Sequence, residues 1–147
     1  MTTFQLKQKI QIVTIAENQL LLLQFAKFYN EGFQNITGSV EDDETFKEAA
    51  HRELVEEIGI VSPLIDLHQE FHFHDKWGAD VEEKVFLCSP SKLPAIRLSA
   101  EHQSFKWIPV SEVTKENFVF PSNFEAFEIR SYVYSWKTER LESYFNT

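Results

Sequence analysis

The sequence predicts an α/β sandwich, in which helices cover a mixed β-sheet. Two observations indicate this fold class: β-rich runs recur along the chain, and two segments carry apolar residues at helical spacing. At 147 residues, of which 43% are hydrophobic, the chain is expected to form one domain over residues 1–147. The β-rich runs lie at residues 10–16, 19–25, 36–40, 64–74, 81–88 and 104–108.

The first two runs are expected to form a hairpin, because only Glu17 and Asn18 separate them. In the fourth run, alternation over residues 69–75 puts His72 and His74 on one face. Two such histidines can bind a transition metal, but a solvated strand face or a substrate rim is the favoured interpretation.

A helix is predicted at residues 46–57. Thr45 and Glu48 match a capping box at its start, and Gly59 stands where a left-handed residue would end it. A second helix is expected to begin at Ser122, and Ser111 is expected to cap a short helical turn. The apolar face of the first helix is formed by Phe46, Ala49, Ala50 and Leu54.

Two carboxylates fall in the middle of that apolar face. At about 100° per residue, Glu53 and Glu57 project between the apolar side chains, with Arg52 and Glu56 beside them. Burying ionised carboxylates costs several kcal/mol each unless they are paired or bind a metal ion. Oxygen ligands of this kind suit Mg²⁺ or Mn²⁺. The alternative is a structural ion-pair network on a surface helix.

These charges belong to a longer pattern over residues 38–60, Gly38-x5-Glu44-x7-Arg52-Glu53-Leu54-x-Glu56-Glu57-x-Gly59-Ile60. The pattern resembles the signature of the Nudix hydrolase family. That resemblance implies a mixed sheet between helices, and a loop–helix–loop that binds divalent cations and hydrolyses a nucleoside diphosphate linked to another group.

Carried over by position, the resemblance implies that Glu53, Glu56 and Glu57 are metal ligands and that Arg52 holds Glu53 in place. Glu44 would support the loop or bind a metal through water. In addition, Gly38 would let the backbone approach the phosphate or the metal closely.

The chain departs from the family pattern at two positions. It has Thr37-Gly38-Ser39 where Pro-Gly-Gly is common, and Asp43 where Gly usually precedes the first Glu. Asp tolerates the left-handed conformation better than most residues, so the loop is expected to survive. The Thr-Gly-Ser run is shared with dihydroneopterin-triphosphate pyrophosphatases, which the chain resembles.

Glu101 is a further candidate, in the loop ahead of the strand at residues 104–108. An exposed loop carboxylate is the simpler interpretation of this residue. In Nudix enzymes, however, a Glu in this loop completes the metal site or serves as the general base. The resemblance therefore leaves both Glu53 and Glu101 open as the base.

Four residues are candidates for binding substrate. Asn123, near the start of the last helix, matches a Pro-x-Asn of MutT-type enzymes and would read a base edge, although it is also a natural helix cap. Phe33 and Phe120 would stack on a flat ring. Lys27 would replace an Arg that often follows the second strand in the family.

Composition and charge limit the other function classes. A net charge of −9 disfavours binding to a nucleic-acid backbone, which needs a basic surface. A single cysteine, Cys88, fits a reducing compartment, and the N-terminus lacks a signal-peptide core. The longest apolar run, at residues 20–23, is too short to span a membrane. We therefore expect a cytoplasmic monomer or homodimer.

The sequence thus predicts a Mg²⁺-dependent pyrophosphohydrolase that cleaves a (d)nucleoside or dihydroneopterin triphosphate to a monophosphate and pyrophosphate. An alternative is a hydrolase of diadenosine polyphosphates, 8-oxo-dGTP or RNA 5′ ends. A sensor that keeps the fold without catalysis is a third hypothesis, against which the complete set of charged residues argues.

Overall fold

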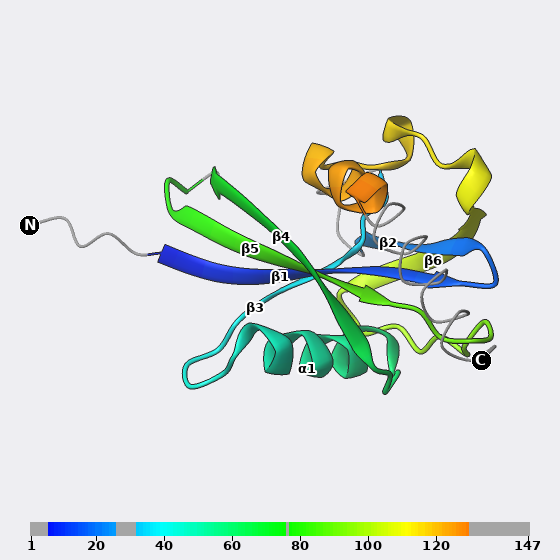
Figure 1. Ribbon diagram of the computed structural model, residues 1–147, viewed down its shortest axis with the longest axis horizontal. Coiled ribbons are helices and arrows are strands. Elements are labelled where there is room, and N and C mark those ends of the chain that lie inside the picture. Colours follow the sequence, from blue (N-terminus) through cyan, green and yellow to red (C-terminus); the bar gives the residue numbers. More distant parts are fainter. Residues whose placement is uncertain (1–5, 26–31, 76, 130–147) are drawn as a thin grey trace, which may run out of the picture.

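A mixed β-sheet lies between two helical layers (Figure 1). The computed structural model describes residues 6–25, 32–75 and 77–129. Helix α1 (Phe46–Ile58) runs along one face of the sheet, and the helical residues 121–129 lie over the other face. This arrangement confirms the predicted α/β sandwich.

The sheet has the strand order β4-β5-β1-β2-β6, with β3 paired to β1 beside that path. The pairing of β1 with β5 is parallel and the other pairings are antiparallel, which makes the sheet mixed. The strands are β1 (Leu6–Ala16), β2 (Gln19–Phe25), β3 (Ile36–Ser39), β4 (Leu64–His74), β5 (Asp80–Cys88) and β6 (His102–Pro109).

The turn between β1 and β2 confirms the predicted hairpin. Glu17 and Asn18 have φ angles of 49° and 60°, so both adopt the left-handed conformation. Two-residue turns of this kind match the right-handed twist of the strands that they join.

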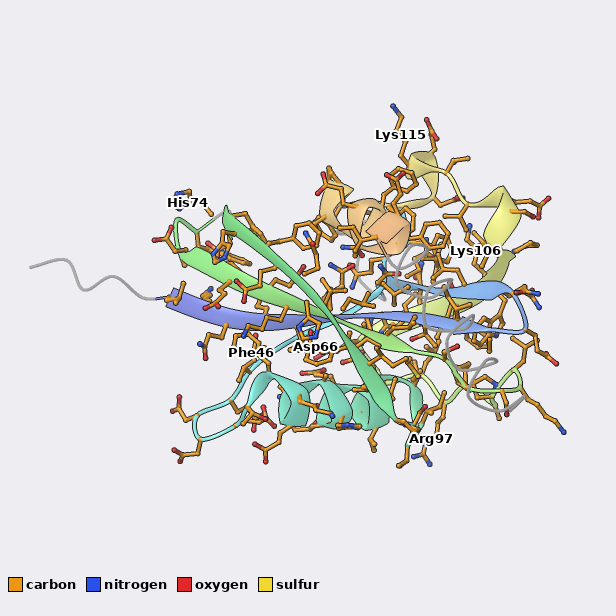
Figure 2. All side chains as sticks on the ribbon, viewed as in Figure 1. Phe46, Asp66, His74, Arg97, Lys106 and Lys115 are labelled. Atoms are coloured by element: carbon orange, nitrogen blue, oxygen red, sulfur yellow. The ribbon has the colours of Figure 1, made fainter. Side chains whose placement is uncertain are left out.

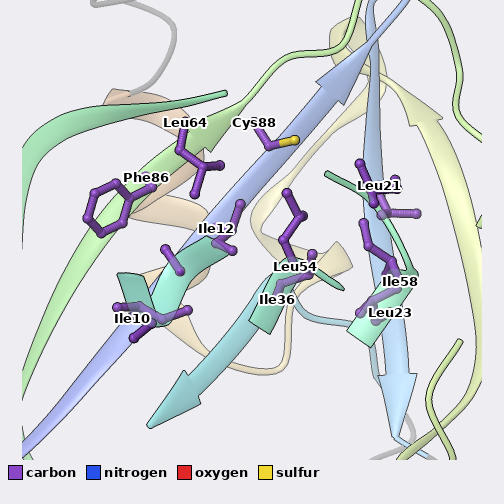
Figure 3. Close-up of a cluster of buried hydrophobic side chains, with 13 residues drawn as sticks. Ile10, Ile12, Leu21, Leu23, Ile36, Leu54, Ile58, Leu64, Phe86 and Cys88 are labelled. Carbon is purple, nitrogen blue, oxygen red and sulfur yellow. The ribbon is translucent and has the colours of Figure 1, made fainter. Parts of the chain in front are cut away.

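Each face of the sheet carries its own apolar cluster. On the α1 side, Leu54 and Ile58 pack with Ile10 and Ile12 of β1 and with Leu23 of β2 (Figure 3). On the other side, the alternate residues of the same strands meet the helical residues 121–129. That second cluster includes Val13, Ile15, Leu20, Leu22, Ala126 and Phe127.

Helix α1 begins and ends as the sequence predicts. Thr45 Oγ1 accepts a hydrogen bond from the Glu48 backbone N–H at 3.1 Å, and Glu48 Oε1 accepts one from the Thr45 N–H at 3.0 Å. Gly59 has a φ of 72° and closes the C-terminus. Because both termini are capped, the register that puts Glu53 on the sheet side is fixed.

The Thr45 cap gives the first testable prediction. Replacing Thr45 by Ala removes the acceptor for the Glu48 N–H, so we expect the free energy of unfolding to fall by about 1 kcal/mol. Urea denaturation measures this change. Lys47→Ala, at an exposed position of the same turn, is the control and should change the free energy by less than about 0.5 kcal/mol.

Some expectations need correction or lie outside the described residues. Ser111 lies inside the short turn Val110–Glu112, which has no side-chain cap, so its predicted role as a cap is wrong. The last helix begins at Pro121, one residue before the expected Ser122, and its expected continuation past Ile129 is outside the described ranges. Within those ranges, no helix is long and apolar enough to cross a membrane.

Candidate active site

The two carboxylates on the apolar side of α1 are buried, as the helical spacing predicts. Glu53 is 8% exposed and Glu57 is 5% exposed. Their helix is held against the sheet by Leu54 and Ile58, both fully buried. Glu56, on the outer side, keeps a 54% exposed side chain. Glu53 and Glu57 therefore do not lie on a solvated helix surface, and this counts against the alternative of an ion-pair network on a surface helix.

Gly38 of β3 makes room for the Glu53 side chain. A Cβ atom on Gly38 would fall 2.2 Å from Glu53 Cδ, which is far inside a van der Waals contact. The sequence resemblance assigned Gly38 to close backbone approach to the phosphate or the metal. In the structure, the group that approaches this glycine is the Glu53 carboxylate itself.

We predict that Gly38→Ala lowers kcat by about tenfold or more while the protein still folds, because the added methyl group must displace the Glu53 carboxylate. Steady-state pyrophosphate release and a circular-dichroism melt measure the two properties. Ser39→Ala is the matched control, since it keeps the backbone carbonyl and changes only an exposed side chain. Full activity of Gly38→Ala would contradict the role given to this glycine.

Arg52 ties the loop before α1 to the helix. Its guanidinium donates to both Glu44 oxygens, at 2.7 and 2.9 Å, and to the Ser39 carbonyl oxygen at 2.8 Å. Arg52 Nη1 also donates to Glu53 Oε1 at 3.0 Å and to Glu56 Oε2 at 3.1 Å. Arg52 therefore holds Glu53 in place, as expected.

Glu44 supports the loop. The hydrogen bonds from Arg52, and a further one from the Glu41 backbone N–H, lower the pKa of Glu44 to about 2. The loop also contains Asp43, whose φ of 66° confirms that a non-glycine residue takes the left-handed conformation there. The loop geometry thus survives the departure from the family pattern.

The environment of Glu53 opposes its ionised form. Burial raises the pKa of Glu53 to about 7, although the hydrogen bond and the charge of Arg52 act in the opposite direction. The nearby carboxylates of Glu57 and Glu56 raise it further. A buried carboxyl group with this balance is one that an added positive charge would stabilise.

Glu57 has the opposite balance. Burial alone would raise its pKa, but His102, Ser99 and Glu101 together bring the pKa below its ordinary value. His102 Nδ1 lies 2.7 Å from Glu57 Oε2, and Ser99 Oγ donates to the same oxygen at 3.2 Å. Glu57 is therefore held as a carboxylate in a fixed orientation.

The loop that carries these partners caps the end of α1. The Arg97 N–H donates to the Ile58 carbonyl oxygen and the Ser99 N–H to that of Glu57, each at 3.0 Å. Figure 2 shows Arg97 at this end of the helix. Glu101 follows in the same loop with its N–H bonded to Ser99 Oγ at 3.3 Å. Its side chain is exposed, but it lowers the pKa of Glu57, so the two carboxyl groups are neighbours.

The chemistry of the acidic set fits a divalent cation. Glu53, Glu56 and Glu57 offer only oxygen ligands, as Mg²⁺ and Mn²⁺ prefer. In the described part of the chain, no three His, Cys, Asp or Glu side chains converge as a ready metal cluster. The Arg52 guanidinium contacts both Glu53 and Glu56 and supplies the positive charge there.

The predicted substrate residues gather on the opposite side of the sheet. The Phe33 carbonyl oxygen accepts from the Val119 N–H at 3.0 Å, and the Asn123 N–H donates to the Phe120 carbonyl oxygen at 3.0 Å. Phe33 is partly buried under Lys106, whose Nζ lies 4.0 Å from the ring centroid, and Phe120 is 43% exposed. Lys27 lies outside the described residues.

Asn123 is buried, and its side-chain oxygen is bonded outside its own helix. It is 2% exposed, and its Oδ1 accepts from the Asn35 backbone N–H at 2.7 Å. A direct base contact through Oδ1 would have to compete with this bond. In the structure, the Asn123 side chain therefore holds the backbone of Asn35 in place.

The histidine pair on β4 is solvated. His72 and His74 have exposed side chains that face Glu70 at 3.3 Å and Asp80 at 2.7 Å. Together with the lack of a metal cluster among the described residues, these contacts favour the predicted solvated face over a transition-metal site.

Sequence reasoning missed the partners of Glu57 and a group of buried polar residues on the other sheet face. No local spacing in the sequence connects His102 with Glu57. Glu83 was not considered, although it occupies a position in β5 whose neighbours of the same parity, Val81 and Val85, are buried. A polar residue at an apolar position of a strand is a signal that the sequence did contain.

The chain matches the NUDIX domain family over residues 7–128. It is 32% identical over 143 residues to a dihydroneopterin triphosphate diphosphatase of Haemophilus influenzae, covering 86% of this chain and 85% of that protein. It is also 37% identical over 81 residues, 53% of this chain, to an octanoyltransferase of Myxococcus xanthus, of which it spans only 23%.

Solved structures show the same fold. The E. coli dihydroneopterin triphosphate pyrophosphohydrolase has a TM-score of 0.74 at 26% identity, with coverage of 82% of this chain and 92% of that one. A C. elegans Ap4A hydrolase complex has a TM-score of 0.75 at 21% identity, with coverage of 88% and 98%. The α/β sandwich is thus a fold that known proteins share.

Proposed function

The chain belongs to the NUDIX domain family, and on that premise we propose that it is a divalent-metal-dependent pyrophosphohydrolase. Its substrate is a (d)nucleoside triphosphate or dihydroneopterin triphosphate, and its products are the monophosphate and pyrophosphate. The whole of residues 1–147 is assigned to one domain, which the match over residues 7–128 supports.

One observation carries the proposal: Glu53 and Glu57 are buried side by side on the sheet face of α1, and each is held by partners that orient it. Two buried carboxylates in this arrangement are costly for stability and have no role in packing the core. A protein that only binds a ligand through the same fold would not require them.

Nudix hydrolases generally use divalent metal ions, and Glu53, Glu56 and Glu57 would hold Mg²⁺ or Mn²⁺ here. When bound, such ions screen the charge of the triphosphate and stabilise the leaving phosphate. Arg52 keeps Glu53 in position throughout, and the contact with His102 keeps Glu57 ionised. These are positioning and electrostatic effects, which dominate phosphoryl transfer.

A carboxylate of the chain takes the proton from the attacking water. Glu53 combines burial with a pKa near 7, the property that suits a general base at neutral pH. Glu101 is the second candidate, because it is an exposed neighbour of Glu57 at the same end of the site. Single Gln variants at the two positions separate them through the pH dependence of kcat.

The choice of substrate rests on the relative at 32% identity, which is a dihydroneopterin triphosphate diphosphatase. The fold does not decide it, since the Ap4A hydrolase superposes equally well. Hydrolysis of diadenosine polyphosphates, 8-oxo-dGTP or RNA 5′ ends is therefore kept as the alternative. A cytoplasmic location and a monomeric or dimeric state stay predictions.

A substrate panel tests the proposal. Dihydroneopterin triphosphate, dATP, 8-oxo-dGTP and diadenosine tetraphosphate are each incubated with Mg²⁺, with Mn²⁺ and with EDTA, in ¹⁸O-labelled water. We expect metal-dependent release of pyrophosphate from the first compound, with the label identifying the phosphorus attacked. Absence of hydrolysis across the whole panel with either metal would remove the proposed activity.

A further inference from the structure

Two residues near the start of β6 hold one oxygen of the Glu57 carboxylate. His102 Nδ1 lies 2.7 Å from Glu57 Oε2, and Ser99 Oγ donates to the same oxygen at 3.2 Å. Because an ionised carboxylate only accepts hydrogen bonds, Nδ1 carries the hydrogen in the first contact. With two donors on one oxygen, the carboxylate cannot turn about its last bond, so the direction of Oε1 is fixed as well. We call Ser99 and His102 the clasp.

A bulge in β6 turns His102 toward α1. Ser104 pairs with Gln24, and His102 then pairs with position 25, so one residue of β6 is left over between the two pairs. In a regular ladder His102 would share the face of Ser104, since alternate residues of a strand lie on one side. The bulge places it instead on the face of Leu23, which packs in the apolar cluster on the α1 side. Bulges of this kind re-aim side chains beside active sites.

Stability alone does not explain the contact between His102 and Glu57. Their side chains are 3% and 6% exposed, so both groups have lost almost all of their hydration. Replacing a buried ion pair by apolar residues of similar volume is often neutral or stabilising. The contact is therefore better explained by its effect on the orientation of Glu57 than by a contribution to the fold.

The clasp also determines where Glu101 lies. Ser99 Oγ, which donates to Glu57, accepts a hydrogen bond from the Glu101 backbone N–H at 3.3 Å. The His102 N–H donates to the Ser99 carbonyl oxygen at 3.2 Å and closes a turn that contains Glu101. The Ser99 N–H donates to the Glu57 carbonyl oxygen at 3.0 Å. One set of bonds therefore joins the turn that carries Glu101 to the end of α1 that carries Glu57.

We propose that His102 is a positioning residue of the hydrolase reaction, which orients the Glu57 carboxylate for a divalent cation and keeps the Glu101 turn beside it. The inference rests on the proposed function, because it deepens the assignment of Glu57 as a cation ligand. His102 acts through Glu57 and needs no contact of its own with the substrate. Removing a partner that orients a metal ligand commonly weakens metal binding or activity by about 10- to 100-fold.

Two substitutions of His102 separate the hydrogen bond from packing. His102→Asn keeps an N–H donor near the position of Nδ1, whereas His102→Leu fills a similar volume without a donor. We expect His102→Leu to lower kcat for dihydroneopterin triphosphate by about tenfold or more, with KM within about threefold of wild type. His102→Asn should keep both constants within about threefold. A purely structural role predicts the reverse order, because Leu suits a buried site better than Asn does.

A second measurement does not depend on hydrolysis. Calorimetry gives the Kd for Mn²⁺ in the protein without substrate, and we expect it to rise about tenfold in His102→Leu and to stay within about threefold in His102→Asn. His72→Leu, at an exposed histidine of β4, is the matched control and should keep the wild-type Kd and kcat. In a Glu57→Gln background, His102→Leu should change kcat by less than about threefold, because the carboxylate through which it acts is already lost.

Wild-type kcat and Mn²⁺ affinity in folded His102→Leu would overturn the proposal, as would equal losses in the Leu and Asn variants. If His102→Leu does not fold, Ser99→Ala, which removes the second donor to Glu57 Oε2, decides instead. It should lower kcat and Mn²⁺ affinity by about threefold or more, and unchanged values would overturn the proposal. A wild type that binds Mn²⁺ without hydrolysing any compound counts against the proposed function, while the Mn²⁺ affinities still test His102. A wild type that does neither overturns both.

Discussion

Replacing Glu57 by Gln is expected to lower the rate of pyrophosphate release by at least about 10²-fold. The physical reason is the arrangement around Glu57 Oε2, where His102 Nδ1 at 2.7 Å and Ser99 Oγ at 3.2 Å hold an ionised carboxylate. The amide has nearly the same shape but no charge, so it cannot act as a cation ligand of the same strength. Steady-state kinetics at saturating Mg²⁺ measures the loss.

The control for this variant is Glu48→Gln. It removes the same charge from the same helix, and Gln can still accept the Thr45 N–H that Glu48 Oε1 accepts in the capping box. We expect its rate to stay within about twofold of wild type. Retained activity in a folded Glu57→Gln protein, shown by an unchanged circular-dichroism spectrum, would refute the role assigned to this carboxylate.

The residues in and next to α1 were sufficient to predict this helix and its buried carboxylates. The capping box at Thr45, the stop at Gly59 and the spacing of the apolar residues place Glu53 and Glu57 toward the sheet without any knowledge of the rest of the fold. The hairpin at Glu17 and Asn18 was predictable for the same reason, since its signal lies within a few residues. Short-range interactions determine all of these features.

Contacts between distant parts of the chain were not predictable. Ser99 lies 42 residues from Glu57, and Asn123 lies 88 residues from Asn35, so no local spacing indicates that these groups meet. The bond that Asn123 Oδ1 accepts from the Asn35 N–H also depends on how these segments pack on the sheet. The exposure of Glu101, by contrast, agrees with the simpler interpretation of this residue as a loop carboxylate. For such residues the sequence predicts a candidate, and its contacts follow only from the tertiary structure.

Glu53→Gln is expected to stabilise the metal-free protein above neutral pH while it removes activity. In the folded protein the pKa of Glu53 is about 7, against an ordinary value of 4.5, so the folded state binds the proton more tightly than the unfolded state does. The free energy of unfolding therefore falls as the pH rises from about 4.5 to about 7. Below about pH 4.5, Glu53 is protonated in both the folded and the unfolded state and does not lower the free energy of unfolding. At 1.36 kcal/mol per pKa unit, ionised Glu53 lowers the free energy of unfolding by up to about 3 kcal/mol.

The variant should accordingly be more stable than wild type at about pH 8 in EDTA, by up to about 3 kcal/mol, and equally stable near pH 4.5. Urea denaturation at the two pH values measures both differences. Mg²⁺ should raise the Tm of wild type more than that of the variant, because the cation compensates a charge that only wild type carries. Equal stability of the two proteins at pH 8 in EDTA would mean that the buried carboxylate is already compensated by Arg52, and the stabilising role assigned to a metal ion at Glu53 would then be lost.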